Sequence, residues 1–372
     1  MPKVSVIIPA YNSMKYLPET LESVLQQTFS DFEVLIINDG SSDNIVQWVS
    51  GLPGFLTSEK SGECGENEEN GRMNENSVPP IPPTLPTLVR NPGLVDPRVK
   101  LISQENQGVS VARNTGIADA QADYIAFVDA DDLWEPTKLE KQVRCLDDHP
   151  EVGLVHTWMA LVDERGKSTG RVLKTSVEGY AWEQIVQRNQ IATLSVMVRR
   201  CCFDTVGVFE PNLRSIEDWD MWIRIATSYP FAVIKEPLVY YRQVPSSISK
   251  NVRVMEQSFH HVIEKTFQSA PAELLHLKHR SYSYANLCLA WKALQSINRD
   301  YKLAIHFRTL AIAHSPQLRF SWEYIRLSLA IAALQLFGVE HYSRVLKLTY
   351  ALRRRIWDLT QFNSMSSSKP NI

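Results

Sequence analysis

Three carboxylates follow one apolar segment of the chain, in the run Phe127-Val128-Asp129-Ala130-Asp131-Asp132. Carboxylates this close together repel one another and raise each other's pKa, and a bound cation removes that cost. Mg²⁺ and Mn²⁺ take oxygen ligands, usually one or two carboxylates together with substrate phosphates. The run therefore indicates a divalent-metal site. The alternative is that Asp132 caps a helix expected over Pro136–Leu146.

Polar residues also follow two other apolar segments. The run Ile37–Asp43 carries Asp39 and Gly40, and its Ser and Asp residues suit either a binding loop or the cap of a following helix. The run Pro9-Ala10-Tyr11-Asn12 offers the flat ring of Tyr11, on which a nucleotide base can stack. Such stacking is worth roughly 1–3 kcal/mol in nucleic-acid complexes.

Two charged groups lie on expected helices. Arg113 stands among small and apolar residues of Gly108–Gly116, where it suits a phosphate clamp or a buried ion pair. Farther along, Glu217, Asp218 and Asp220 cluster at a helix start, where the helix dipole favours acidic side chains. Trp219 and Trp222 stand beside them and suit a sugar-binding wall, which a capping role does not explain.

The elements that must position these groups alternate along the first 150 residues. Strands are predicted over Val4–Ile8, Phe32–Ile37, Val99–Ser103 and Tyr124–Val128, and helices over Leu17–Gln27 and Val109–Ala120. This alternation favours a parallel sheet covered on both faces, in which ligands bind at the carboxyl ends of the strands. The chain has no GxGxxG after its first strand, no GxxxxGK[ST] phosphate loop and no GxSxG nucleophile elbow.

Beyond residue 150 the pattern is mixed. Val152–Val162 alternates loosely and precedes a turn. Ser195–Val198 reads as a short strand, Trp219–Ala226 as a helix, and Ala232–Ile234 with Leu238–Tyr241 as two short strands. From Arg253 onward the chain is rich in helix formers, which predicts a helical appendage; a tetratricopeptide-like repeat is the alternative.

Residues 51–97 interrupt the alternation. This segment is rich in Gly, Pro, Asn and Glu and shows no periodicity, so it is expected to be a disordered insertion; a proline-rich docking site is the alternative. The expected organisation is therefore a domain over residues 1–250 with that insertion, a helical region over 251–360 and a flexible tail over 361–372.

Composition narrows the class of protein. The 372 residues carry a net charge of −2, whereas a dedicated nucleic-acid binder usually shows a basic excess. The five cysteines show neither CxxC nor zinc-finger spacing, which favours a reducing compartment. No signal segment or membrane-spanning stretch is expected, and Leu327–Val339 reads as a buried or interfacial helix, so a cytoplasmic location is predicted.

Contact with the inner face of a membrane is a further expectation. Basic residues follow the apolar helix with no acidic residue between Tyr342 and Trp357; they are Arg344, Lys347, Arg353, Arg354 and Arg355. A solvated helix face packed on the preceding domain is the alternative.

Four ordered motifs together resemble family 2 glycosyltransferases, which have the GT-A fold. They are Val4–Asn12, Val34–Asp43, Asn106–Gly116 and Tyr124–Pro136, and the resemblance covers roughly residues 3–50 and 98–245. It implies a GT-A α/β fold with a Rossmann-like, mostly parallel sheet. It also implies that Asp129 and Asp131 form the family's DxD motif, which holds a nucleotide-sugar diphosphate through Mg²⁺ or Mn²⁺. The residues implied to line the nucleotide pocket are Pro9, Tyr11, Asn12 and Asp39.

The same resemblance extends to two later positions. Arg113 is implied to help hold the diphosphate or the sugar. Ser215–Trp222 resembles the family's Glu-Asp motif, which implies that Asp218 is the catalytic base. The sequence departs from the family after Tyr241-Arg242, where Gln243 and Val244 stand in place of a histidine that many relatives carry. The insertion at 51–97 is a second departure.

The function expected from the resemblance is metal-dependent, inverting transfer of a sugar of the hexosyl type. The donor would be a nucleotide-diphosphate sugar, and the acceptor a hydroxyl of a glycan or a lipid-linked sugar, in the synthesis of a cell-surface polysaccharide or glycolipid. Two alternatives remain: a nucleotidyltransferase, which would need a glycine-rich basic loop after the first strand, and a non-catalytic scaffold acting through the helical region.

Overall fold

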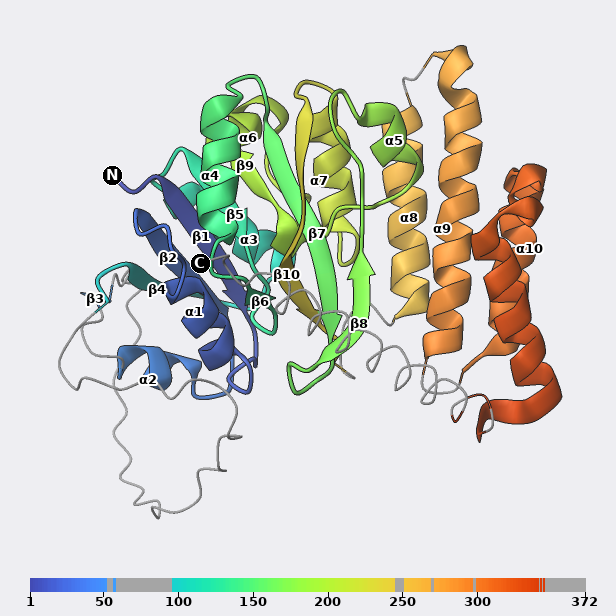
Figure 1. Cartoon of the computed structure of the whole chain (residues 1–372), viewed down its shortest axis with the longest axis horizontal. Coiled ribbons are helices and arrows are strands. Elements are labelled where there is room, and N and C mark those ends of the chain that lie inside the picture. Colours follow the sequence, from blue (N-terminus) through green and yellow to red (C-terminus); the bar gives the residue numbers. More distant parts are fainter. Residues whose placement is uncertain are drawn as a thin grey trace, which may run out of the picture.

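The structure is a computed structural model that describes residues 1–51, 56–57, 96–244, 251–268, 271–296, 299–340, 342 and 344. Most of the predicted insertion at 51–97 and the whole tail at 361–372 lie outside the described residues, as do Lys347 and Arg353–Arg355. Figure 1 shows a central sheet, helices packed on its faces, and a group of C-terminal helices standing beside it.

A ten-stranded mixed sheet forms the centre of the molecule, in the order β3-β4-β2-β1-β5-β9-β7-β10-β6 with β8 paired to β7. The pairs among β3, β4, β2, β1 and β5 are parallel, as is β7 with β10, whereas β9, β6 and β8 run antiparallel to their neighbours. The strands are β1 Val4–Ala10, β2 Phe32–Asp39, β3 Leu56–Thr57, β4 Val99–Gln104, β5 Tyr124–Phe127, β6 Leu133–Trp134, β7 Leu154–Val162, β8 Ser168–Leu173, β9 Met197–Arg199 and β10 Phe231–Arg242.

Helices connect and cover these strands. Those of the sheet region are α1 Leu17–Leu25, α2 Ile45–Ser50, α3 Val109–Asp119, α4 Lys138–Asp148, α5 Trp182–Gln187, α6 Arg200–Val206 and α7 Glu217–Ala226, with a 3₁₀ turn η1 at Thr193–Ser195. The C-terminal helices are α8 Val252–Phe267, α9 Leu275–Gln295 and α10 Tyr301–His314, with 3₁₀ turns η3 Ala272–Leu274 and η4 Pro316–Phe320. A further helix spans Trp322–Glu340.

The central strands are apolar because both faces of the sheet are covered. In β1 the apolar side chains of Val4, Val6, Ile7 and Ile8 are all fully buried, as the near-continuous apolar run predicts. Val4 lies opposite Phe32 of β2 on one side and Tyr124 of β5 on the other. This register brings the carboxyl ends of β2, β1 and β5 to one edge of the sheet, where the polar runs begin.

Helix α3 approaches this sheet closely, and a glycine permits that approach. A Cβ atom added to Gly116 would lie 2.5 Å from Cγ2 of Ile7 in β1, which no side chain could accommodate without displacement. Gly116 therefore fixes how closely α3 packs on β1, and with it the position of Arg113 one turn earlier on the same helix.

Two apolar cores lie on the two faces of the sheet. One contains Val4, Val6 and Leu17 and is covered by α1 and α4. The other begins at Ile7 and Leu35 and continues without a break through Trp219 of α7 and Phe259 of α8 to Leu334. The C-terminal helices therefore share a hydrophobic core with the sheet. The expected boundary near residue 250 stays a prediction.

The predicted α/β class, the mostly parallel sheet and the helical C-terminal region are confirmed. One detail is wrong: the two short strands predicted at Ala232–Ile234 and Leu238–Tyr241 are parts of the single strand β10. Register shifts on both sides of Pro237 interrupt the pairing of β10 with β7, and Lys235 and Glu236 are exposed there. Read from the sequence alone, the polar, proline-containing bulge resembles the end of one strand and the start of another, although a single strand continues through it.

The helix Trp322–Glu340 is longer than the apolar segment expected at Leu327–Val339. An 18-residue window of this 19-residue helix has a mean hydropathy of 1.2, so by length and composition the helix is long and apolar enough to cross a membrane. The expectation that no stretch reaches this length is therefore wrong. Only a minority of the helix is buried inside the protein.

Candidate active site

The acidic run identified first lies directly after β5, at the edge of the sheet where β1 and β2 also end. Asp129 and Asp131 are partly buried, and Asp132 is fully buried. Burial, reinforced by the neighbouring Asp129 carboxylate, raises the pKa of Asp131 to about 6. A cation bound here would favour the ionised form of Asp131 and so lower this pKa. That is the effect for which a metal site was predicted from the sequence.

Arg242, at the end of β10, holds this acidic loop in place. Its backbone N–H donates to Oδ1 of Asp132 at 2.7 Å, and its Nε donates to the backbone carbonyl of Asp131 at 2.7 Å. Its Nη2 donates to Oε2 of Glu19 in α1 at 2.6 Å. Sequence reasoning considered Arg242 only as the partner of Tyr241 in a motif and missed this structural role.

Asp132 does not cap a helix. The residue at the N-cap position of α4 is Thr137, and Asp132 Oδ1 accepts from Arg242 instead. The second carboxylate oxygen, Oδ2, is buried and has no hydrogen-bond partner among the described residues. Burial together with Asp131 and Asp129 raises the pKa of Asp132 well above its ordinary value. The capping alternative for Asp132 is therefore wrong.

Arg113 of α3 connects two acidic motifs that are far apart in the sequence. Its Nη2 lies 2.8 Å from Oδ1 of Asp129, and its Nη1 lies 2.6 Å from Oε1 of Glu217 at the start of α7. The side chain is only 3% exposed. Although burial opposes its charge, the two carboxylates raise the pKa of Arg113 above its ordinary value. The ion-pair alternative left open for Arg113 thus describes its contacts in this structure.

Asp218 lies beside Glu217 and is held by two side chains from the segment before β9. Nδ2 of Asn189 donates to Oδ1 of Asp218 at 3.0 Å, and Oγ1 of Thr193 in η1 donates to Oδ2 at 3.2 Å. Burial and then the charge of Glu217 raise the pKa of Asp218 to about 7, while Arg113 and the Asn189 hydrogen bond oppose that rise. A carboxylate with this pKa is suited to accept a proton near neutral pH.

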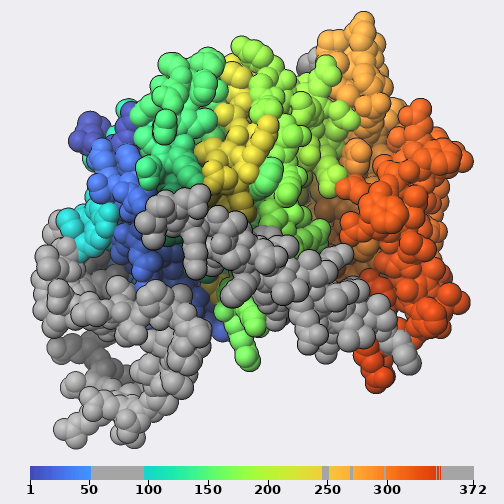
Figure 2. Space-filling view, viewed as in Figure 1, coloured from blue at the N-terminus to red at the C-terminus, as the bar shows by residue number. Residues whose placement is uncertain are grey.

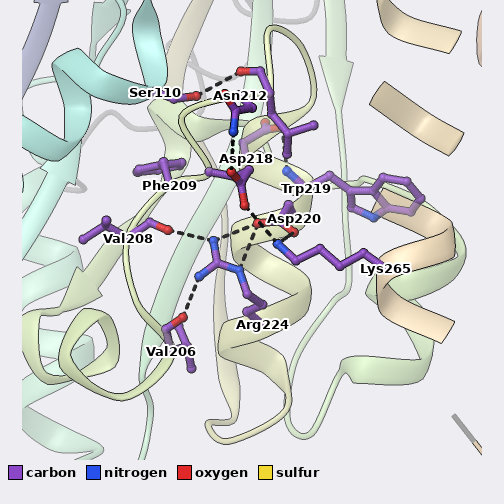
Figure 3. A network of polar contacts seen from close by, with 12 residues as sticks. Ser110, Val206, Val208, Phe209, Asn212, Asp218, Trp219, Asp220, Arg224 and Lys265 are labelled. Carbon is purple, nitrogen blue, oxygen red and sulfur yellow. Dashed lines mark hydrogen bonds and ion pairs between the residues drawn. The ribbon is translucent and has the colours of Figure 1, made fainter. Parts of the chain in front are cut away.

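The third acid of that cluster, Asp220, is a structural residue. Its Oδ2 accepts from Nε and Nη2 of Arg224 at 2.9 and 2.8 Å, and its Oδ1 accepts from Nζ of Lys265 in α8 at 3.1 Å (Figure 3). Arg224 also donates to the backbone carbonyls of Val206 and Val208. Asp220 therefore ties α7 to α8 and to the loop after α6, with both of its oxygens engaged.

The two tryptophans beside these acids do not form a sugar-binding wall. Trp219 and Trp222 are 1% and 0% exposed. Their indole Nε1 atoms donate to the backbone carbonyls of Ile185 and Ile191 at 2.7 and 3.2 Å. The sequence interpretation of both residues is wrong because their spacing on α7 points them into the core shared with α8.

Asp39, at the end of β2, organises the loop before α3. Its carboxylate accepts hydrogen bonds from Nε2 of Gln104 at 2.8 Å and from the backbone N–H groups of Gln107 and Gly108 at 2.9 and 2.8 Å. The side chain is almost fully buried. Asp39 thus shapes the wall of the expected nucleotide pocket through these contacts.

The turn after β1 is fixed to the turn after β2. Asn12 adopts a left-handed backbone conformation, with φ of 48°, and its Oδ1 accepts from the backbone N–H and the hydroxyl of Ser42. Tyr11 is 54% exposed, and Pro9 lies in β1 opposite Ile37. Tyr11 is therefore the residue of this edge whose ring is presented to solvent and open to stacking.

The residues at this edge fit a metal ion only in part. Asp129 and Asp131 supply the oxygen atoms that Mg²⁺ and Mn²⁺ prefer. Within the described part of the chain, no three His, Cys, Asp or Glu side chains are placed to hold a metal ion by themselves. A metal held here would need further oxygen ligands from a bound substrate, which a diphosphate can provide.

Comparison with known proteins agrees with this arrangement. Residues 5–60 and 90–202 match the model of the family described as Glycosyl transferase family 2. An uncharacterized glycosyltransferase of Rickettsia felis is 33% identical over 236 residues, which cover 63% of this chain and 32% of that protein. The chain thus spans about a third of the length of the Rickettsia relative.

Two further proteins are similar over most of their own length. A putative teichuronic acid biosynthesis glycosyltransferase of Bacillus subtilis is 28% identical over 255 residues, covering 67% of this chain and 82% of that protein. A mannosyltransferase of Pyrobaculum calidifontis, solved with GDP-mannose and Mn²⁺, has 18% sequence identity and a TM-score of 0.52 over 96% of this chain and 87% of its own. At that identity the structural likeness concerns the fold.

Proposed function

We propose, from the premise that this chain belongs to glycosyl transferase family 2, that it transfers a sugar from a nucleotide-diphosphate sugar to an acceptor hydroxyl with inversion at the anomeric carbon. One observation carries the proposal. The guanidinium of Arg113 contacts both Asp129, in the motif assigned to the donor, and Glu217, next to the assigned base. This contact links the loop assigned to the donor with the start of the helix that carries the proposed base, which supports a single site for both.

The donor is assigned to the carboxyl ends of β1, β2 and β5. Tyr11 supplies a ring for the base, while Pro9, Asn12 and Asp39 form the wall behind it. Asp129 and Asp131 would hold the diphosphate through Mg²⁺ or Mn²⁺, and such an ion, when bound, compensates charge on the departing nucleoside diphosphate. The fold neighbour from Pyrobaculum was solved with a nucleotide sugar and Mn²⁺, which supports this class of donor and cation.

Asp218 is the proposed catalytic base. One of its carboxylate oxygens accepts the proton of the acceptor hydroxyl as the hydroxyl oxygen bonds to the anomeric carbon. The bond from that carbon to the diphosphate oxygen breaks, and its electron pair leaves with the nucleoside diphosphate. Such general-base help contributes typically about 10²–10⁴-fold, so positioning of donor and acceptor supplies the rest.

The acceptor is proposed to be a glycan or a lipid-linked sugar used for a cell-surface polysaccharide or glycolipid. The Bacillus relative named for teichuronic acid biosynthesis supports this setting. We assign the protein to the cytoplasm, in peripheral contact with the inner face of the membrane through its basic C-terminal part.

The test is turnover by the purified protein against a panel of nucleotide sugars, each with Mg²⁺, Mn²⁺ or a chelator. The proposal expects release of nucleoside diphosphate from one donor class, dependent on the cation and reduced at least about 10²-fold in Asp218→Asn. Release of pyrophosphate from a nucleoside triphosphate would instead identify a nucleotidyltransferase. Absence of turnover with every donor, together with absence of donor binding, would favour a scaffold.

A further inference from the structure

The last long helix of the described chain exposes large apolar side chains along one face. Leu329 and Leu336 are 61% and 76% exposed. We call this face, together with the aromatic residue that precedes the helix, the apolar surface; its residues are Phe320, Trp322, Ile325, Leu329, Leu336 and Val339. Trp322, Ile325, Leu329 and Leu336 recur at spacings of three, four and seven residues, which place them in one row along the helix.

The opposite face of the same helix is firmly attached to the protein. Leu327, Ile331 and Leu334 are buried in the core shared with α9 and α10. Near its start, Glu323 pairs with Arg188 at 2.7 Å, and Arg326 lies over the ring of Trp291 in α9 at 5.8 Å. A helix that is apolar all round is normally covered on all sides. Here the described part of the chain covers one side only, which leaves the apolar surface for another occupant.

The charged residues near the apolar surface indicate which kind of occupant fits it. In the described residues from 299 to 344, Arg and Lys number six (Arg299, Lys302, Arg308, Arg319, Arg326, Arg344) and acids three (Asp300, Glu323, Glu340). Glu323 is already engaged by Arg188. The chain as a whole has a net charge of −2, whereas these described residues carry three more basic than acidic side chains. Arg319 lies over the ring of Phe320, and Arg326 is exposed next to Ile325 on the helix. An apolar row with such basic side chains beside it matches the headgroup boundary of an anionic bilayer.

We propose that the apolar surface lies on an anionic lipid bilayer, with the helix Trp322–Glu340 parallel to the membrane plane and its opposite face still packed on α9 and α10. The aromatic rings of Phe320 and Trp322 belong at the level of the headgroups, where amphipathic rings are favoured. The helix is long enough to span a bilayer, but spanning would require Leu327, Ile331 and Leu334 to leave the core. The proposal rests on the membrane contact proposed above and names the surface that makes it.

In Figure 2 the C-terminal helices, coloured orange to red, form one end of the molecule, beside the green and yellow parts of the sheet region. The residues assigned to the donor belong to β1, β2, β5 and the loops that follow them. A membrane bound at the helical end would therefore leave those loops open to a soluble nucleotide sugar.

The test is co-sedimentation of the full chain with vesicles of phosphatidylcholine alone or with phosphatidylglycerol added. Wild type is expected to sediment with the anionic vesicles, and added salt should weaken that binding. Leu329→Glu and Leu336→Glu should each lower vesicle affinity at least about tenfold. Tyr180→Glu is the matched control, because Tyr180 is an exposed aromatic residue, 81% accessible, just before α5 and outside the apolar surface. Equal binding by all four proteins would overturn the proposal.

Two further measurements test the two alternative occupants of the apolar surface, which are residues 345–372 and a second copy of the chain. If residues 345–372 covered the apolar surface, Leu336→Glu would lower the thermal midpoint without lipid by more than about 5 °C, whereas a lipid-facing position predicts little change. If a second copy covered it, wild type would form a concentration-dependent dimer in the absence of lipid that Leu336→Glu abolishes. Either result would overturn the proposal. Hydrolysis of a soluble nucleotide sugar should be the same in Leu336→Glu and wild type, so loss of vesicle binding does not bear on the catalytic assignment.

Discussion

Asp129 and Glu217 are bound to the same guanidinium, that of Arg113, at distances of 2.8 and 2.6 Å. One residue belongs to the loop after β5 and the other begins α7, so the contact joins the two acidic motifs through a third element, α3. Glu217 is adjacent to Asp218 in sequence and contributes to its raised pKa. Arg113 thus links Asp129 to the neighbourhood of the proposed base through one buried side chain.

Removal of Arg113 should destabilise the protein. Because the side chain is 3% exposed and pairs with two carboxylates, Arg113→Met leaves those charges uncompensated and should cost roughly 3 kcal/mol of unfolding free energy. Arg113→Lys should cost less, since an ammonium can reach one carboxylate but not both. Urea unfolding of Arg113→Met, Glu217→Gln and the double variant gives the coupling energy. Additivity to within about 0.3 kcal/mol would show that the two side chains are independent.

Asp218→Asn should strongly reduce transfer while leaving donor binding almost unchanged. An amide keeps the shape of the side chain but cannot accept the proton, so turnover should fall at least about 10²-fold while donor affinity changes less than about threefold. Donor affinity is measured by calorimetry with Mn²⁺, beside the transfer rate. Near-normal transfer by this variant would exclude Asp218 as the base. Since Asp220 is bound by Arg224 and Lys265, attention would then move to Glu217.

The dependence of transfer on pH should follow the ionisation of Asp218. A base must be deprotonated, and burial raises the pKa of Asp218 to about 7, so kcat/KM should rise with pH and level off above about 7. Asn189 donates to the carboxylate and favours its charged form, so Asn189→Ala should raise that pKa and move the acidic limb to higher pH. An equal loss of rate at every pH, with the limb unmoved, would mean that Asn189 only supports the fold.

Donor binding should require the acidic loop after β5. Asp131→Ala removes an oxygen ligand and should lower the affinity for a nucleoside diphosphate at least about tenfold, with loss of its dependence on Mg²⁺ or Mn²⁺. The control is Glu236→Ala, which removes an exposed carboxylate paired with Lys141 on the surface. Calorimetry that finds unchanged, metal-dependent binding in Asp131→Ala would argue that the loop has no part in holding the donor.

The network around Asp220 should matter for stability (Figure 3). Asp220→Ala leaves Arg224 and Lys265 without their shared partner and should lower the unfolding free energy by roughly 3 kcal/mol. Glu178→Ala, which breaks an exposed pair with Lys235, should change it by less than about 1 kcal/mol. Urea unfolding monitored by tryptophan fluorescence compares the two. Equal effects would contradict the structural role assigned to Asp220.

Much of the fold could be predicted because apolar periodicity is a local signal. The buried strands β1, β2 and β5 are almost continuous apolar runs, and the acidic loop follows one of them directly in the sequence. The contacts of Asp218 with Asn189 and Thr193 could not be predicted in this way. Those residues precede β9 and approach α7 only in the folded chain, and no periodicity or spacing relates them to Asp218.

The errors at Trp219 and Trp222 have a different origin. Their residue type suits a sugar-binding surface, but side-chain direction on α7 decides which face they occupy, and that face packs on α8. Arg242 was overlooked for a related reason. A charged residue at the end of β10 looks solvent-exposed in the sequence, and only the tertiary fold places the buried carboxylate of Asp132 beside it.

The core that runs from Ile7 through Trp219 and Phe259 to Leu334 has a thermodynamic consequence. Elements that share one core lose their packing together when that core is disrupted. Heating should therefore unfold the sheet and the C-terminal helices in one cooperative transition, with the calorimetric enthalpy equal to the van't Hoff enthalpy. In folding terms the helices that carry the apolar surface belong to the same cooperative unit as the sheet, so a destabilising change at one end of the molecule lowers the stability of the other.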